Sequence, residues 1–172
     1  MTMRPLPHLA VLALLAAPLA AQQPPPRIDR SWLRVDRAAH RVTFTLLAGS
    51  SPTNGGLNFN GFTAGHLTLE VPSGWEVVVR HRNLDPKLPH SVELIGATDP
   101  LPVQAVPPVV PGAASARLLE GIPPGAAETI RFTAPDGEYR LFCAVPGHGL
   151  AGMWLRVSVS KRVRAPALRA TP

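Results

Sequence analysis

The chain has 172 residues and a net charge of +6, with 17 lysines and arginines against 11 acidic residues and one cysteine. This length suits a single domain with a sizeable core, and one cysteine excludes an internal disulfide. From Arg27 to Arg156 the chain holds 12 basic and 11 acidic residues, and no basic patch is interleaved with aromatic side chains. The charge therefore argues against a nucleic-acid partner.

The N-terminus has the pattern of a secretory signal peptide. Arg4 precedes the apolar run Leu9–Ala17, and small residues follow up to Ala21. A membrane anchor is the less favoured alternative, because the run is shorter than the ~20 residues that a spanning helix needs. We predict a signal peptide over 1–21, a proline-rich linker over 22–30, and an exported protein in the periplasm or on the extracytoplasmic face.

Period-two alternation of polar and apolar residues recurs through the predicted domain, residues 31–160. Clusters of Gly, Pro, Asn and Asp separate the alternating runs, which is typical of an all-β sandwich. We predict seven or eight strands, from candidate runs at 32–36, 41–46, 67–71, 76–80, 91–95, 129–133, 138–143 and 155–160. Residues 113–120 are the one segment predicted to form a turn or two of helix.

Two segments depart from this alternation. Residues 98–115, TDPLPVQAVPPVVPGAAS, are rich in proline, which cannot donate hydrogen bonds in a central strand. We therefore expect a long loop there, and an apolar rim beside a site, since the segment follows the strand after His90. Residues 161–172 form a basic C-terminal tail that we expect to be a solvated end, and membrane contact is predicted only through it.

The segment FCAVPGHGLAGMW contains the only cysteine, Cys143, followed by His148 and Met153 in the spacing C-x4-H-x4-M. Thiolate and imidazole together bind copper or zinc, and two histidines with one cysteine and a weak axial methionine are typical of an electron-transfer copper site. The glycines of this loop allow tight turning. A lone thiol in an oxidising compartment also needs burial or a bound partner.

A second histidine has to come from elsewhere in the chain, and His90 in NLDPKLPHSVEL is the best candidate. It stands at the start of a predicted strand after a proline-containing turn. Taken singly, each of these residues has a structural explanation, such as a buried core cysteine. Their combination predicts one metal site formed by four side chains, namely His90, Cys143, His148 and Met153.

The sequence resembles the blue copper proteins of the cupredoxin family, and within that family most closely the sulfocyanin group. FCAVPGHGLAGMW resembles the copper loop of this group, LPHSVEL its first-histidine segment, and LNFNGFTAGHLTLEVPSGWEVVVRHRN its central stretch. The resemblance covers roughly residues 32–160. It implies a Greek-key β-sandwich and one copper ion, Cu(I)/Cu(II), held as a type 1 site by those four side chains.

The resemblance also implies roles for neighbouring residues. The backbone N–H of Ser91 is expected to point at the Cys143 sulfur, and that of Val145, which is not proline here, is a second candidate. Serine at 91, where many relatives have asparagine, leaves the side-chain part of the link between the two ligand loops open. An apolar patch for partner docking is expected from Pro146, Gly147, Leu150, Leu101 and Pro102.

The function expected from these features is that of a monomeric, non-enzymatic shuttle of single electrons in a respiratory chain. Its expected partners are redox proteins such as a cytochrome or a terminal oxidase. A copper enzyme is disfavoured because the chain has no His-x-His pair. A copper carrier or storage protein remains the main alternative, although two of the three methionines lie in the signal segment. A zinc or empty structural module is a further one.

Overall fold

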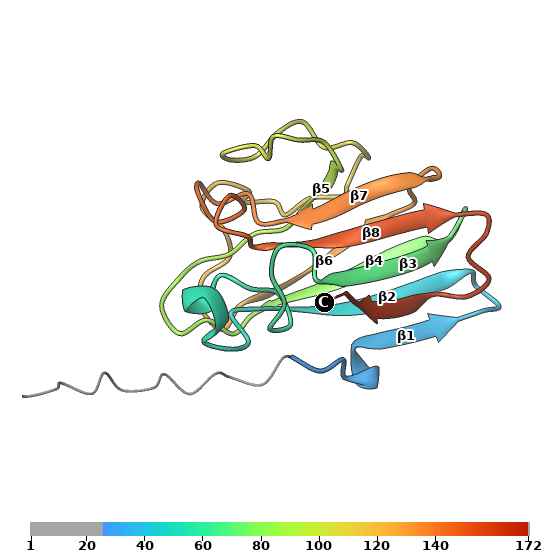
Figure 1. Ribbon diagram of the computed structural model, residues 1–172, viewed down its shortest axis with the longest axis horizontal. Helices are drawn as coiled ribbons and strands as arrows, with labels where there is room; N and C mark the ends of the chain where they lie inside the picture. The colour runs from blue at the N-terminus through green and yellow to red at the C-terminus, as the bar shows by residue number, and fades with distance from the viewer. Residues whose placement is uncertain (1–25, 172) are drawn as a thin grey trace, which may run out of the picture.

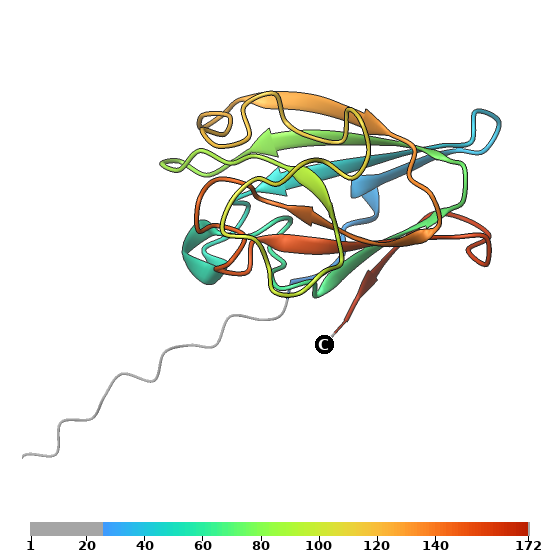
Figure 2. The same ribbon diagram turned by 90° about the horizontal axis from the view of Figure 1, so that it is seen from above.

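The computed structural model describes residues 26–171 and shows a sandwich of two β-sheets (Figures 1 and 2). Nine strands are found in this part of the chain. They are β1 (Leu33–Asp36), β2 (Arg41–Ala48), β3 (Leu67–Pro72), β4 (Glu76–Asn83), β5 (Glu93–Gly96), β6 (Ala127–Phe132), β7 (Gly137–Phe142), β8 (Trp154–Ser160) and β9 (Ala167–Ala170). Two short 3-10 turns, η1 (Arg30–Trp32) and η2 (Thr53–Gly56), complete the regular structure of the same part.

The two sheets mix parallel and antiparallel pairing. The first has the order β1-β2-β4-β6 and the second the order β5-β7-β8-β3-β9. Strands β2 and β4 run parallel, as do β3 and β8. Between the two strands of each pair, the chain crosses to the other sheet and back. This layout brings the ends of β4 and β7 and the start of β8 to one end of the sandwich, the left end in Figure 1.

The core lies between the sheets, where the alternating residues of each strand meet. Along β2 the burial alternates strictly, and Phe44 and Leu46 are fully buried while Thr43 and Thr45 face outward. Leu69 of β3 and Leu155 of β8 belong to the same apolar cluster. Burial of such side chains is the main term that stabilises a sandwich of this kind.

The predicted all-β sandwich is confirmed, with one strand more than expected. The missed strand is β9, whose residues Ala167–Ala170 pair with β3 at the edge of the second sheet. Arg169 also donates to the Glu70 carboxylate, 3.0 Å away. These residues form an ordered edge strand instead of the expected solvated end, because pairing with β3 satisfies the backbone groups on one side of the strand.

Two further predictions concern residues 113–120 and the N-terminus. Residues 113–120 form turns and an isolated bridge at Ala114 rather than helix, because the backbone of this segment pairs with the start of β5. The predicted signal peptide and the first part of the predicted linker lie outside the described residues. Within residues 26–171 we find no helix with the length and apolar character needed to cross a bilayer.

The proline-rich segment 98–115 forms a long loop without helix or regular strand, as predicted. Glu93, at the start of β5, lies beneath it and is fully buried. One carboxyl oxygen of Glu93 accepts from the Val106 N–H at 3.3 Å, and the other has no hydrogen-bond partner. Burial raises the pKa of this carboxyl from 4.5 to about 7, so the neutral acid is the form that suits the fold.

We expect the stability of the metal-free protein to fall as pH rises from about 4.5 to about 7 because of Glu93. The unfolded chain releases this proton near pH 4.5 and the folded chain only near pH 7, so the folded state binds more protons in this window. The expected loss is about 2 kcal/mol, less than the full shift implies, because charges inside proteins are screened more than in a dry interior.

Urea unfolding at pH 5 and pH 8 measures this effect, with Glu93→Gln as the comparison because the amide keeps the shape of the neutral acid. The variant should lose less stability than the wild type between the two pH values. Equal losses in both proteins would contradict the assignment to Glu93.

Candidate metal centre

His90 is held in place by backbone pairing ahead of β5. Its N–H donates to the Ile122 carbonyl at 3.2 Å and its carbonyl accepts from the Ile122 N–H at 2.8 Å. Gly121, the residue before Ile122, has φ +72, and a Cβ there would lie 2.8 Å from the backbone nitrogen of His90. Glycine is therefore required at 121 both for its backbone conformation and for this close approach.

Cys143 follows directly after β7, and residues 143–153, here called the ligand loop, connect it to β8. The Cys143 N–H donates to the Met153 carbonyl at 3.0 Å, and the Met153 N–H donates to the His148 carbonyl at 3.1 Å. These two bonds close the loop on itself. They bring the backbones of Cys143, His148 and Met153 close together, although up to ten residues separate them in the chain.

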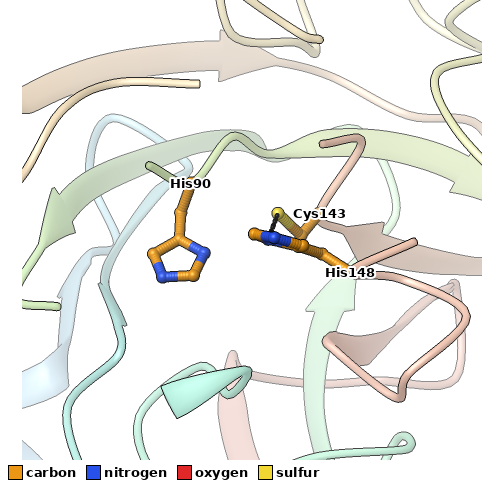
Figure 3. Close-up of side chains that lie close together, drawn as sticks. All are labelled: His90, Cys143 and His148. Carbon is orange, nitrogen blue, oxygen red and sulfur yellow. Dashed lines mark hydrogen bonds between the residues drawn. The ribbon is translucent and has the colours of Figure 1, made fainter. Parts of the chain in front are cut away.

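The side chains of His90, Cys143 and His148 converge at the end of the sandwich (Figure 3). One potential metal-binding atom from each lies within 4.8 Å of the others. The Cys143 sulfur is 3.6 Å from His148 Nδ1, and the ring centroids of His90 and His148 are 5.2 Å apart. Met153, the fourth predicted residue, is fully buried in the same loop.

The two nitrogens of His90 have different surroundings. Nε2 lies 3.2 Å from Asp85 Oδ2, whereas Nδ1 is buried and has no hydrogen-bond partner. A buried nitrogen without a partner is costly unless something binds it. Since Asp85 accepts the Nε2 proton, Nδ1 keeps its lone pair and is the atom available to a metal ion.

Burial sets the protonation of the metal-binding groups. It lowers the pKa of His90, against the opposing effect of Asp85, and it lowers the pKa of His148. It raises the pKa of the Cys143 thiol to about 11. The imidazoles are therefore neutral and ready to bind a cation, while the thiol is protonated without metal and gives up its proton when an ion binds.

Ser91 ties the two ligand segments together. Its Oγ accepts from the Ala144 N–H at 3.1 Å, so serine makes the side-chain link that the sequence left open. The backbone N–H groups of Ser91 and Val145 act to lower the pKa of Cys143, against the larger effect of burial. An N–H group that donates to a thiolate stabilises its negative charge. A thiolate with such donors favours the oxidised metal less strongly than a thiolate without them.

The residues predicted for docking belong to the ligand loop, which contains the half-buried His148, and to the proline-rich loop. Pro146, Gly147 and Leu150 are exposed on the ligand loop, and Leu150 is 48% exposed. Gly147 donates to the Val103 carbonyl at 3.0 Å, which joins the ligand loop to the proline-rich loop. Leu101 and Pro102 of that second loop are partly exposed beside it.

Sequence reasoning missed the residues that support the site from outside the ligand segments. Asp85 is one of these, and its place five residues before His90 in NLDPKLPHSVEL was the available signal. The two asparagines of LNFNGF were read only as part of a resemblance. Asn58 and Asn60 are in fact buried, and their amides bond the backbone of this stretch to itself and to β2. Their alternation with buried Phe59 was the available signal.

A β-sandwich that carries two histidines and a buried cysteine at one end is a cupredoxin. In agreement, the structure is similar to rusticyanin from Thiobacillus ferrooxidans, with 21% identity, a TM-score of 0.52, and coverage of 74% of this chain and 86% of that one. It is also similar to auracyanin from Roseiflexus castenholzii, with 23% identity, a TM-score of 0.50, and coverage of 68% and 95%. These similarities establish the fold.

The chain belongs to the sulfocyanin family, since the sulfocyanin (SoxE) domain matches residues 30–169. It is 32% identical to sulfocyanin from Sulfolobus acidocaldarius over 133 residues, which make up 73% of this chain and 66% of that protein. The match thus spans just under two thirds of the relative's length. The predicted family is confirmed, and the three side chains that converge here fit the single copper ion predicted as the cofactor.

Proposed function

We propose that this protein is an exported mononuclear type 1 copper protein that shuttles single electrons between redox partners of a respiratory chain. In this proposal His90, Cys143, His148 and Met153 bind the ion. The convergence of one thiol and two imidazoles within 4.8 Å, in a fold of the cupredoxin class, is the observation that carries it. Copper supplies the one-electron chemistry, since both of its oxidation states accept nitrogen and sulfur ligands.

The surrounding residues hold the ligands in one arrangement. Asp85 orients the His90 ring, and Ser91 links the two ligand segments through Ala144. Cys143 and Met153 are fully buried, so water does not reach the thiol. A site that keeps its ligands fixed needs little rearrangement when the charge of the ion changes, which favours fast electron transfer.

The proposed route for the electron is the His148 ring, the one imidazole of the site that is not fully buried. It is surrounded by Pro146, Gly147 and Leu150, with Leu101 and Pro102 alongside. Such a patch suits small, short-lived contacts with redox proteins such as a cytochrome or terminal oxidase. We propose a monomer without enzymatic activity, exported to the periplasm or the extracytoplasmic face.

Copper titration and redox cycling test this function. The purified protein loaded with cupric ion should become intensely blue, lose its colour on reduction and regain it on oxidation without consuming substrate. A copper carrier, the alternative function, would instead release its ion readily to a chelator of moderate affinity. A protein that stays colourless with cupric ion would refute the type 1 site.

We expect Asp85→Asn to lower copper affinity about tenfold or more. Asp85 Oδ1 accepts from the N–H groups of Lys87 and Leu88, while Oδ2 faces His90 Nε2. The amide keeps the first oxygen and places an N–H donor against His90, so the turn survives and the ring loses its acceptor. Competition with a chelator of known affinity measures the change.

Asp36→Asn is the matched control for this variant. Asp36 Oδ1 also accepts a backbone N–H in a turn, that of Ala39 at 3.0 Å, but between β1 and β2 at the other end of the sandwich. Its substitution should leave copper affinity unchanged. Equal affinities of the Asp85→Asn variant and the wild type would show that Asp85 does not orient His90.

A further inference from the structure

Residues 53–66, here called the central segment, lie against the second half of the ligand loop. Three hydrogen bonds join them to it and to the start of β8. The Asn54 amide nitrogen donates to the Ala151 carbonyl at 2.7 Å, the Ala64 N–H to the Gly152 carbonyl at 2.7 Å, and the Gly65 N–H to the Trp154 carbonyl at 3.1 Å. The bonded carbonyls therefore lie on both sides of Met153 in the chain.

Asn54 is the one side chain among these three contacts, and its own position is fixed. Its amide nitrogen also donates to the Leu57 carbonyl at 3.0 Å, so both amide protons are used. Its backbone has φ 54, a conformation that asparagine and glycine tolerate and most other residues do not. The backbone conformation and the bond to Leu57 thus hold the side-chain amide of Asn54 against the Ala151 carbonyl.

The central segment is rigid enough to act as a support. The Asn58 amide nitrogen donates to the carbonyls of Ser51 and Thr53, and its oxygen accepts from the Gly61 N–H. The Asn60 side chain both accepts a hydrogen bond from a backbone N–H of β2 and donates one to a backbone carbonyl of β2. Both side chains are buried, where hydrogen bonds are costly to break. The support behind Asn54 is therefore a folded unit and not a free loop.

Met153 lies where this support meets the ligands. Its N–H and carbonyl bond to His148 and Cys143, and its side chain is fully buried. Cys143 and His148 have other attachments, through Ser91 to Ala144 and through Val103 to Gly147. The contacts of the central segment fall instead on Ala151, Gly152 and Trp154, next to Met153 on either side.

We propose that Asn54 is a positioning residue that, through Ala151, fixes the distance of the Met153 sulfur from the copper ion and thereby sets the reduction potential. This inference rests on the proposed function, since it takes Met153 as the weak axial ligand. Cu(II) gains more than Cu(I) from an added ligand. A ligand loop released from the central segment lets the sulfur approach Cu(II), which stabilises the oxidised form.

Asn54→Gly tests this, because glycine keeps the left-handed backbone and removes only the amide. The blue wild-type protein and the variant are titrated at equilibrium. At the potential where the wild type is half reduced, the ratio of reduced to oxidised variant should be lower by about threefold, the size of a single neutral hydrogen bond. In the metal-free variant, the Gly152 and Met153 amide protons should exchange faster.

His40→Gly is the control for replacing a residue of positive φ, because His40 has φ 46 in the turn before β2, at the far end of the sandwich. It should leave both measurements unchanged. In a Met153→Leu background, Asn54→Gly should no longer shift the potential. An unchanged or raised potential in Asn54→Gly, or an equal fall in the Met153→Leu background, would overturn the role of Asn54. A wild-type protein that does not turn blue would refute the copper site itself.

Discussion

A Cys143→Ala variant loaded with cupric ion is expected to show none of the intense blue absorption of the wild type. That absorption comes from charge transfer between a thiolate and copper, and Cys143 is the only cysteine of the chain. Copper affinity should fall more than about 100-fold, because loss of even a residue that only orients a ligand costs about 10–100-fold. Visible absorption and chelator competition give both results.

The fold should survive this substitution, since alanine is an apolar residue slightly smaller than the buried cysteine that it replaces. The thermal transition of the metal-free variant is the control, and it should lie within a few degrees of the wild-type transition. A His66→Ala variant, in an exposed position outside the site, should keep both colour and affinity. A blue Cys143→Ala protein would contradict the proposed ligand set.

Gly149→Ala is expected to destabilise the protein by about 3 kcal/mol or more and to displace the ligand loop. A Cβ at 149 would lie 1.9 Å from Phe142 Cε2 and 2.0 Å from Cζ. The Phe142 ring is fully buried, so it cannot turn away without disturbing the core. Because His148 is the preceding residue, the displaced backbone should also weaken copper binding.

Gly96→Ala is the matched control, since the nearest atoms to a Cβ there are at 3.8 and 4.0 Å, an ordinary contact. Its stability should stay within about 0.5 kcal/mol of the wild type, as for most substitutions that create no clash. Urea unfolding of the metal-free proteins measures both variants. Equal stabilities for Gly149→Ala and Gly96→Ala would show that the loop moves freely around Phe142.

Most of the sandwich could be predicted from local patterns. All eight candidate runs of the sequence overlap with strands, because most of these strands bury one face and alternate polar and apolar residues along their length. Strand β9 was not predicted, because its residues lie at a sheet edge and are only half buried or exposed. With no buried face, a short edge strand leaves no period-two signal, and its backbone pairing with β3 depends on the whole sheet.

The chemistry of the site was also contained in short stretches of sequence. The spacing of Cys143, His148 and Met153 within one loop indicates a metal site by itself, because a short glycine-rich loop forces its side chains together. The sequence offers several histidines, and only the antiparallel pairing of β5 with β7, which sets Glu93 opposite Phe142, brings His90 to Cys143. The prediction that Cys143 needs a partner or burial followed from composition alone.

By itself, the sequence determined the fold class and three of the four proposed ligands, because these depend on residues close together in the chain. The tertiary structure alone decided which groups support them. Asn54 meets Ala151, 97 residues away, through packing of segments that no local pattern places together. Asp85 lies only five residues before His90, and the folded turn between them sets its carboxylate against the ring. A hydrogen bond between distant residues exists only once the sheets have assembled, so no sequence period could reveal it.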